Sequence, residues 1–462
     1  MTAFQMIIKN AKYYSEGRFF EGDIGVLDGK IVSITAPGLL QGDSDKTIDA
    51  SGLHVLPGVV DSHVHFRDPS RPDREDFYTG STAAAAGGVT TFCEMPLAIP
   101  PPNNVANLQN RINVGHERSM VDFALFGAAG FDNRNDFQPL IDAGVIAFKT
   151  FLHPAPEGRE LEFDGLTVND DGALYRMMEA GAETNGRYYF HCENAKLIAA
   201  IEQKLHEMGV EDYSFHYKSR CNLAETHSVA TILMFAKATG CKVGIVHISA
   251  PEACELVKQA QNEGQDVVAE TCFHYLTYHH GDIDKFGPYA KCNPPLRSKE
   301  DMEKLWDYVL DGTISYIGSD HAPFVPEEKE IGVREGIWRA YSGMPAVELL
   351  LPLMLTHVNA GRLTLEELTP LLTENTARIY GIFPQKGCIA LGSDADFAIV
   401  DMNCPYTIRI EDMYCKSKVV NKLFDETPVT GKVKYTVVRG RVLMENGQVD
   451  LNNRGYGRFV RP

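Results

Sequence analysis

The chain has 462 residues, of which 44% are hydrophobic, and a formal net charge of −18 at pH 7. This length is enough for one large barrel and a smaller second domain. The negative charge disfavours a broad electrostatic contact, so we expect no nucleic acid and no membrane as partners. The ten cysteines are scattered without a C-x-x-C pair, and the first residues lack the apolar segment of a signal peptide. We therefore expect a cytoplasmic protein with reduced thiols.

The two ends of the chain have the same texture of short β segments interrupted by glycines. The clearest of these are residues 6–9, 30–34, 396–400 and 435–443. We expect residues 1–54 and 389–462 to form the two parts of one small β-sandwich domain. Residues 55–388 would then form a separate central domain.

The central part of the chain alternates apolar, β-rich runs with longer helical segments. This alternation is typical of parallel βα units. The eight runs lie at about residues 55–61, 89–94, 121–126, 145–151, 188–191, 242–248, 267–271 and 314–319. Eight units predict an α/β fold of the (β/α)₈ TIM barrel type. In that fold the chemistry lies at the carboxyl ends of the strands, so the residues that close each run are the candidates for the site.

The first apolar run ends in two histidines, His63 and His65, which lie two residues apart. Side chains at that spacing share one face of a strand, and two neutral imidazoles on one face can bind a metal. A single His-x-His is equally compatible with one packed and one solvated ring. Later runs, however, end in His191, His247 and Asp320. Their joint placement on strands one, five, six and eight predicts a metal site on the rim of the barrel.

The fourth run contains a lysine, Lys149, within an otherwise apolar segment. A buried ammonium group is costly unless it is paired or neutralised. One interpretation is a lysine at the barrel mouth whose amine reaches water. The other is an amine of lowered pKa that takes up carbon dioxide and bridges two metal ions as a carbamate. The residues alone leave both interpretations open.

Seven segments resemble, in order and over nearly the whole chain, those of the cyclic amidohydrolases, which include hydantoinases, allantoinases, dihydropyrimidinases and class I dihydroorotases. These segments are residues 56–65, 86–91, 148–149, 191–194, 291–297, 318–323 and 392–396. The resemblance implies a TIM barrel with a β-sandwich from both termini and a centre of two divalent metals, expected to be zinc. It also implies a small-molecule substrate and a homo-oligomer, a tetramer or a dimer.

By position, the resemblance assigns His63, His65 and Asp320 to one metal and His191 and His247 to the other. It assigns Lys149 as N6-carboxylysine, whose carbon dioxide-derived carbamate bridges the two metals. A hydroxide held between two such metals would attack the ring amide. Asp320 would accept its proton and deliver it to the departing ring nitrogen.

The substrate is predicted from residues around the first metal-binding segment. Arg67 occupies the place of an arginine that clamps the substrate carboxylate in dihydroorotases. Leu97 and Phe324, however, stand where those enzymes usually have Asn and His. Segments such as 94–97 and 381–387 look more like the allantoinase and L-hydantoinase branch. We therefore expect a five-membered cyclic ureide of the hydantoin or allantoin type, with dihydroorotate as the alternative.

Weaker assignments concern the rest of the substrate pocket. Asn293, Ser342 and Gly343 match family positions whose backbone groups hold the cyclic diamide. Two other functions fit the sequence less well than catalysis on a cyclic amide. A non-enzymatic assembly homologue is disfavoured because all six ligands are present. A metal-dependent phosphoesterase fits the histidine pair and the lysine but not the segments 291–297 and 318–323.

Overall fold

The structure is a computed structural model that describes residues 3–462. Its larger part is a sheet of eight strands that are all parallel to their neighbours. In order they are β6 (Val59–Val64), β7 (Val89–Glu94), β8 (Asp122–Ala128), β9 (Ala147–Phe151), β10 (Arg187–His191), β11 (Lys242–Ile245), β12 (Val267–Cys272) and β13 (Tyr316–Gly318). A parallel bridge between Val64 and His321 joins the first strand to the segment after the last. The predicted barrel is confirmed.

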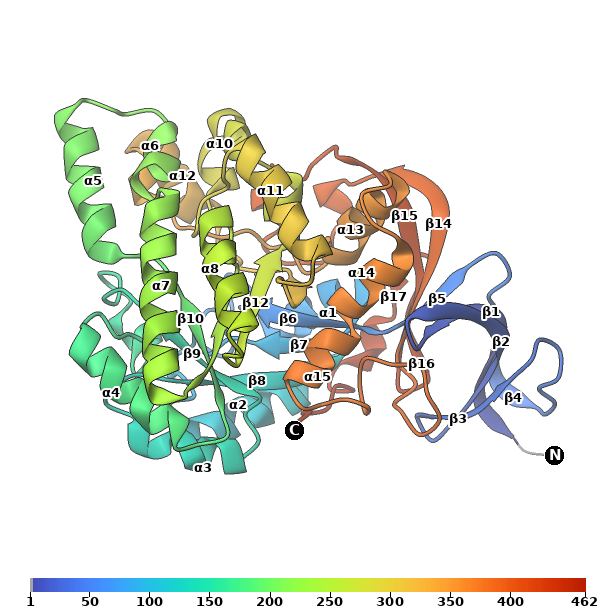
Figure 1. Ribbon diagram of the computed structural model, residues 1–462. Helices are drawn as coiled ribbons and strands as arrows, with labels where there is room; N and C mark the ends of the chain where they lie inside the picture. Colours follow the sequence, from blue (N-terminus) through green and yellow to red (C-terminus); the bar gives the residue numbers. More distant parts are fainter. Residues whose placement is uncertain (1–2) are drawn as a thin grey trace.

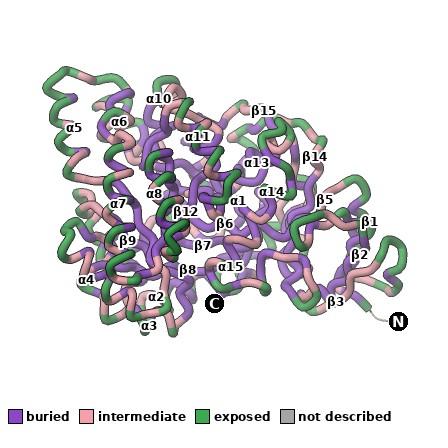
Figure 2. Tube along the Cα trace, in the orientation of Figure 1, coloured by how far each residue is buried: buried purple, intermediate pink, exposed green. Residues whose placement is uncertain are grey.

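The barrel strands show no regular alternation of buried and exposed residues because both of their faces are covered. Every residue of β6, β7 and β8 is buried, with side chains facing either the barrel interior or the outer helices. Parallel strands enclosed in this way need no polar face, which explains why periodicity alone does not mark them. Figure 2 shows that the barrel strands are buried inside and that exposed residues lie on the outer helices.

Fifteen helices lie among the described residues, most of them around the barrel (Figure 1). They are α1 (Phe77–Ala86), α2 (Val105–Arg118), α3 (Phe137–Asp142), α4 (Asp171–Ala182), α5 (Ala195–Glu207), α6 (Ser214–Ser219), α7 (Asn222–Thr239), α8 (Pro251–Asn262), α9 (Phe273–Thr277), α10 (His280–Phe286), α11 (Lys299–Leu310), α12 (Pro326–Arg334), α13 (Leu350–Asn359), α14 (Leu365–Leu372) and α15 (Glu374–Ile379). Several begin at a side-chain cap, as at Asp76 and Ser298, whose oxygens accept backbone N–H groups of the first turn. Within residues 3–462 no helix combines the length and the apolar character that a bilayer crossing requires.

The second part of the molecule is a nine-stranded sheet built from both ends of the chain. Its strands are β1 (Phe4–Ser15), β2 (Arg18–Leu27), β3 (Lys30–Thr35), β4 (Ser44–Asp49), β5 (His54–Pro57), β14 (Phe397–Thr407), β15 (Pro428–Val438), β16 (Arg441–Glu445) and β17 (Gln448–Val449). Strand β5 joins the two sets, because it pairs in parallel with β1 and antiparallel with β14. Figure 1 shows the blue and red strands meeting there. A separate sheet from both termini is therefore confirmed.

The chain finishes at the amino ends of the barrel strands. Phe459 forms a parallel bridge with Phe123 at the start of β8, and the Val460 amide donates to the Phe123 carbonyl over 2.8 Å. Next to this contact, Asp122, Asp394 and Asp396 converge from the barrel and the sheet. We call these three carboxylates the lower cluster, because they lie at the end of the barrel opposite the predicted site.

Candidate metal centre and active site

The predicted ligands gather at the carboxyl ends of the barrel strands. They come from β6 and the residue after it, from β9, from β10, and from the second residues beyond β11 and β13. All of them line one cavity of about 790 Å³: His63, His65, Lys149, His191, His247 and Asp320. The fold therefore brings together six residues that are spread over more than half of the chain.

Three of these residues form a compact group that we call the rim cluster: His63, His65 and Asp320. Each offers one ligand atom, and the three atoms lie within 4.8 Å of one another. The Nε2 atoms of the two histidines are 3.2 Å apart, and each lies 3.3 Å from Oδ1 of Asp320. Two imidazole nitrogens and a carboxylate oxygen at these distances are a ligand set for a divalent metal such as zinc.

The neighbours of His63 indicate what the rim cluster requires. Its Nδ1 lies 2.8 Å from Oε1 of Glu270, and the other oxygen of this carboxylate accepts the Ser62 hydroxyl over 2.7 Å. A neutral His63 that donates from Nδ1 turns the lone pair of Nε2 toward His65 and Asp320. Electron pairs that face each other without a proton between them fit a cation at their centre.

His191 and His247 form a second pair, in which a carboxylate again faces one ring nitrogen and leaves the other toward the centre. Nδ1 of His191 lies 3.0 Å from Nε2 of His247, while Nε2 of His191 faces Oε2 of Glu193 at 2.8 Å. Burial would raise the pKa of Glu193, but Arg220, 2.6 Å away, and His191 outweigh it and lower that pKa to about 2. The Glu193 carboxylate therefore accepts from Nε2 and leaves Nδ1 of His191 as a free ligand atom.

Burial also sets the charge of the imidazoles. It lowers the pKa of His65, His191 and His247 below the ordinary histidine value. A neutral ring is the form that binds a metal, because a protonated nitrogen has no lone pair to offer. Burial therefore keeps these three rings in the neutral form that binds a metal.

Lys149 lies in the middle of β9 and is fully buried. Its Nζ atom has no hydrogen-bond partner within the described chain, and it lies 5.1 Å from the centroid of the Phe151 ring. Burial lowers the pKa of Lys149 to about 8, against the opposing pull of Asp320 and Glu270. A partnerless amine with a lowered pKa is more nucleophilic near neutral pH than an exposed lysine.

Three residues of the site adopt a left-handed backbone without being glycine. The φ angles are 60° at Arg67, 39° at His247 and 45° at Asp320. Such angles cost roughly 1–2 kcal/mol per residue, because Cβ approaches the following carbonyl. They occur where a strand gives way to a loop and the side chain turns into the barrel mouth. Strain of this kind persists where the surrounding structure holds it for function.

The predicted substrate residues also line the cavity, whose lining combines apolar side chains with arginines and other charged residues. The Arg67 guanidinium lies over the Phe324 ring, 5.1 Å from its centroid, and Leu97 lies on the same wall. Asn293, Ser342 and Gly343 line the same cavity, and Gly343 lies against the Phe324 ring. The Gly343 amide donates to the Lys291 carbonyl over 2.8 Å, so the Gly343 carbonyl is the backbone group that this residue can offer to a substrate.

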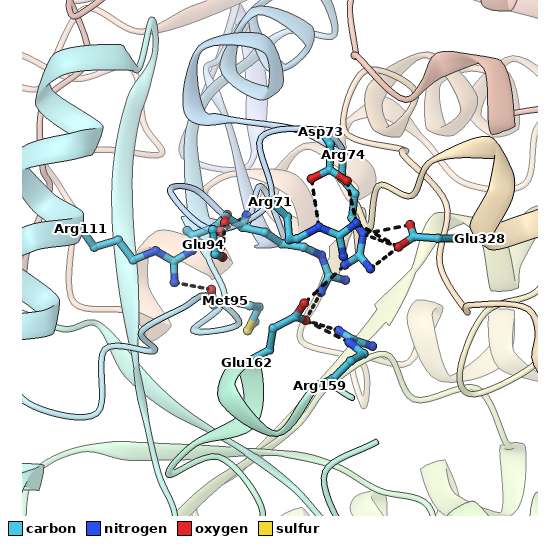
Figure 3. A network of polar contacts seen from close by, with 11 residues as sticks. Arg71, Asp73, Arg74, Glu94, Met95, Arg111, Arg159, Glu162 and Glu328 are labelled. Atoms are coloured by element: carbon cyan, nitrogen blue, oxygen red, sulfur yellow. Dashed lines mark hydrogen bonds and ion pairs between the residues drawn. The ribbon is translucent and has the colours of Figure 1, made fainter. Parts of the chain in front are cut away.

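Several polar residues around the site were not predicted from the sequence. Glu270 could have been predicted, because it is an acidic residue inside the apolar strand β12, as Lys149 is a basic residue inside β9. The network of arginines and carboxylates in Figure 3 was not predicted either. In it, Arg74 reaches Glu328 across 254 positions of sequence, and Arg159 reaches Glu162 on the loop between β9 and α4. Arg159 and Glu162 are only three positions apart, but no local pattern marks the pair of Arg74 and Glu328.

The eight-stranded barrel and the histidines at its rim define a barrel hydrolase with a candidate metal centre. Residues 54–443 match the amidohydrolase family, and the chain belongs to that family. It is 36% identical over 459 residues to an L-hydantoinase of Paenarthrobacter aurescens, which covers 99% of this chain and 98% of that protein. A solved L-hydantoinase (dihydropyrimidinase) from Arthrobacter aurescens superposes with a TM-score of 0.94 at 35% identity, covering 99% of this chain and 100% of that one.

Other relatives carry different names at similar identity. An allantoinase of Bacillus licheniformis is 34% identical over 463 residues and covers 99% of both chains. A dihydroorotase of Methanothermobacter thermautotrophicus is 36% identical over 438 residues, with coverage of 95% of this chain and 94% of that protein. Overall identity thus supports hydrolysis of a cyclic amide and does not rank these substrates. The ranking has to come from the pocket.

Proposed function

We propose that this protein opens the ring amide of a five-membered cyclic ureide of the hydantoin or allantoin type. Its class, a hydrolase that acts on cyclic amides, follows from the family. The observation that carries the proposal is the convergence of His63, His65 and Asp320 in one cavity at the carboxyl ends of the barrel strands. Dihydroorotate is the alternative substrate. A non-enzymatic assembly role is disfavoured because the candidate ligand set is intact.

The proposal includes two divalent metal ions, expected to be zinc. His63, His65 and Asp320 would hold one, and His191 and His247 the other. Lys149 would bridge them as N6-carboxylysine, since its buried amine has no partner and a lowered pKa. The carbamate would add a negative charge to a ligand set in which Asp320 is otherwise the only carboxylate. Bound there, the ions would lower the pKa of water and polarise the substrate carbonyl.

The residues of the chain have separate tasks in the proposed reaction. Asp320 accepts a proton from the attacking water and returns it to the ring nitrogen as the C–N bond breaks, so one carboxylate serves as base and then as acid. Glu270 and Glu193 hold the His63 and His191 rings in the orientation that faces the centre. Asn293 and the Ser342–Gly343 backbone are proposed to hold the cyclic diamide.

The wall around Arg67 supports an uncharged ring substituent. Leu97 and Phe324 supply apolar surface against which a carboxylate would lose water, and Arg67, the donor beside Phe324, is already paired with Glu162. We further propose residues 1–54, 55–388 and 389–462 as the domain limits. We also propose that the protein is a homo-oligomer, either a dimer or a tetramer, and that it is located in the cytoplasm.

The test is a side-by-side assay of hydantoin, allantoin, dihydroorotate and dihydrouracil with enzyme loaded with zinc, with kcat/KM measured for each. The expected result is that hydantoin or allantoin is the best substrate and that a chelator removes the activity. The same preparation after chelation serves as the control for metal dependence. If dihydroorotate exceeds both by about tenfold, a difference of 1.4 kcal/mol, the alternative replaces this proposal.

A further inference from the structure

One carboxylate near the cavity, Glu162, is surrounded by arginines. It lies in the 3₁₀ turn Glu160–Phe163 on the loop that follows β9. Its Oε2 accepts from Nε and Nη2 of Arg159 at 3.0 and 2.5 Å and from Nη1 of Arg67 at 3.3 Å, and Nη1 of Arg74 lies 3.7 Å from Oε1. Figure 3 shows Glu162 between Arg159 and Arg74.

These arginines differ in what else they contact. Arg74 has a second carboxylate, because its Nη2 and Nε reach Glu328 at 2.5 and 2.9 Å. Arg67 and Arg159 have Glu162 as their carboxylate partner within residues 3–462. They are also the two that line the cavity, whereas Glu162 lies behind them. The Glu162 side chain is only 5% exposed.

Two guanidinium groups beside a cavity are an anion site unless something neutralises them. Each presents a planar set of donors that matches a carboxylate. Glu162 already accepts from Nε and Nη2 of Arg159 and from Nη1 of Arg67, although Nε of Arg67 has no partner among the described residues. A ligand carboxylate at Arg67 would therefore meet a like charge a few ångströms away in a poorly solvated place, where such a contact costs several kcal/mol.

We propose that Glu162 is an internal counter-ion that determines substrate charge: it balances positive charge of Arg67 and Arg159 and so disfavours cyclic ureides that carry a carboxylate. This inference rests on the proposed function and deepens it. It assigns the preference for uncharged substrates to one side chain, where the sequence had suggested only that the apolar neighbours of Arg67 weaken a clamp. Glu162 is thus a specificity-determining residue.

The test uses two probes of nearly equal shape, hydantoin-5-acetate and its primary amide. The first carries a carboxylate at neutral pH and the second carries none. We compare kcat/KM and the dissociation constants of both probes for the wild type and for Glu162→Gln. The wild type should prefer the amide. In Glu162→Gln the acid-to-amide ratio should rise about tenfold to a hundredfold, the range that one charge-assisted hydrogen bond provides.

The matched control is Glu157→Gln. Glu157 lines the same cavity and lies on the same loop, but it is exposed and forms no ion pair with Arg67 or Arg159. Removing its charge should change the ratio by less than about twofold, because exposed charges are screened. The triple variant with Arg67→Met, Arg159→Met and Glu162→Gln should lose the gain, because both guanidinium groups that would bind the acid are then absent.

Each outcome decides the inference. An unchanged ratio in Glu162→Gln, with the amide still bound as in the wild type, overturns it. So does a wild type that binds the acid as well as the amide, since Glu162 would then yield its place to the ligand. A gain that survives in the triple variant also overturns it. If no form hydrolyses either probe, the dissociation constants still test Glu162, while the assays of hydantoin and allantoin separately decide the proposed function.

Discussion

The two ends of the barrel each hold three potential metal ligands within 4.8 Å, yet they differ in how charge is balanced. In the lower cluster Lys386 sits among the carboxylates of Asp122, Asp394 and Asp396, with Nζ at 2.5, 3.0 and 2.6 Å from their oxygens. Arg439 pairs with Asp122 from another side. The lower cluster therefore contains its own cations.

The rim cluster has no comparable partner among the described residues. The nearest candidate, Lys149, forms no hydrogen bond to it, and its pKa is lowered by burial. Both clusters bury their ligand atoms, so proximity and burial do not distinguish a metal site from a structural ion-pair network. What distinguishes them is whether the protein itself supplies the positive charge.

The largest effect is expected for Lys149→Ala. Without the amine no carbamate can form, so the variant should lose metal and activity together. Metal content by mass spectrometry and kcat on hydantoin measure both. A short carboxylic acid added with divalent metal should restore part of the rate by replacing the carbamate. A variant that keeps two metals and full activity would erase the proposed role of Lys149 at the rim.

Asp320→Asn tests whether the rim carboxylate does more than balance charge. The amide can neither accept nor return a proton, so kcat should fall by roughly 10²–10⁴. Circular dichroism and thermal unfolding should show an intact fold. Activity within tenfold of the wild type would exclude Asp320 as the group that moves the proton.

Lys386→Met probes the lower cluster. Three buried carboxylates would lose their shared cation, and the free energy of unfolding should fall by about 3–5 kcal/mol. Urea denaturation measures this change, and metal content should stay the same. Lys30→Met is the matched control, because Lys30 pairs with Asp394 from a position that is 44% exposed. It should cost less than about 1 kcal/mol. Equal losses in the two variants would contradict the comparison.

Glu270→Gln should have the smallest effect of the four. It leaves every rim ligand in place and weakens the carboxylate that orients His63 and accepts from the Ser62 hydroxyl and the His247 amide. Metal affinity should fall by about 10–100-fold. Competition with a chromophoric chelator measures the affinity. An unchanged affinity would mean that the His63 ring is held by packing alone.

Much of this organisation was predictable from the sequence because the signals are local. His63, Lys149 and His191 each lie in or at the end of a short apolar run, and the barrel repeats that unit until the ends meet. The barrel and the terminal sheet are confirmed, and the strand limits differ by a few residues. Glu270 could have been found by the same rule that marked Lys149.

The remaining features depend on pairs that the fold alone creates. Arg67 and Glu162 are 95 positions apart, and Lys386 and Asp122 are 264 apart. Nothing in the sequence around either member announces the other. The sequence therefore indicated an arginine at the pocket but not that its charge was already matched.

The end of the chain has a practical consequence for a surface-bound catalyst. Phe459 and Val460 are fixed against β8 at the amino ends of the strands, and Pro462 lies next to Gly381. The cavity opens at the other end of the barrel. Enzyme attached to a resin or electrode through Pro462 would therefore keep its opening toward the bulk liquid, and small reactants would diffuse in without passing the support.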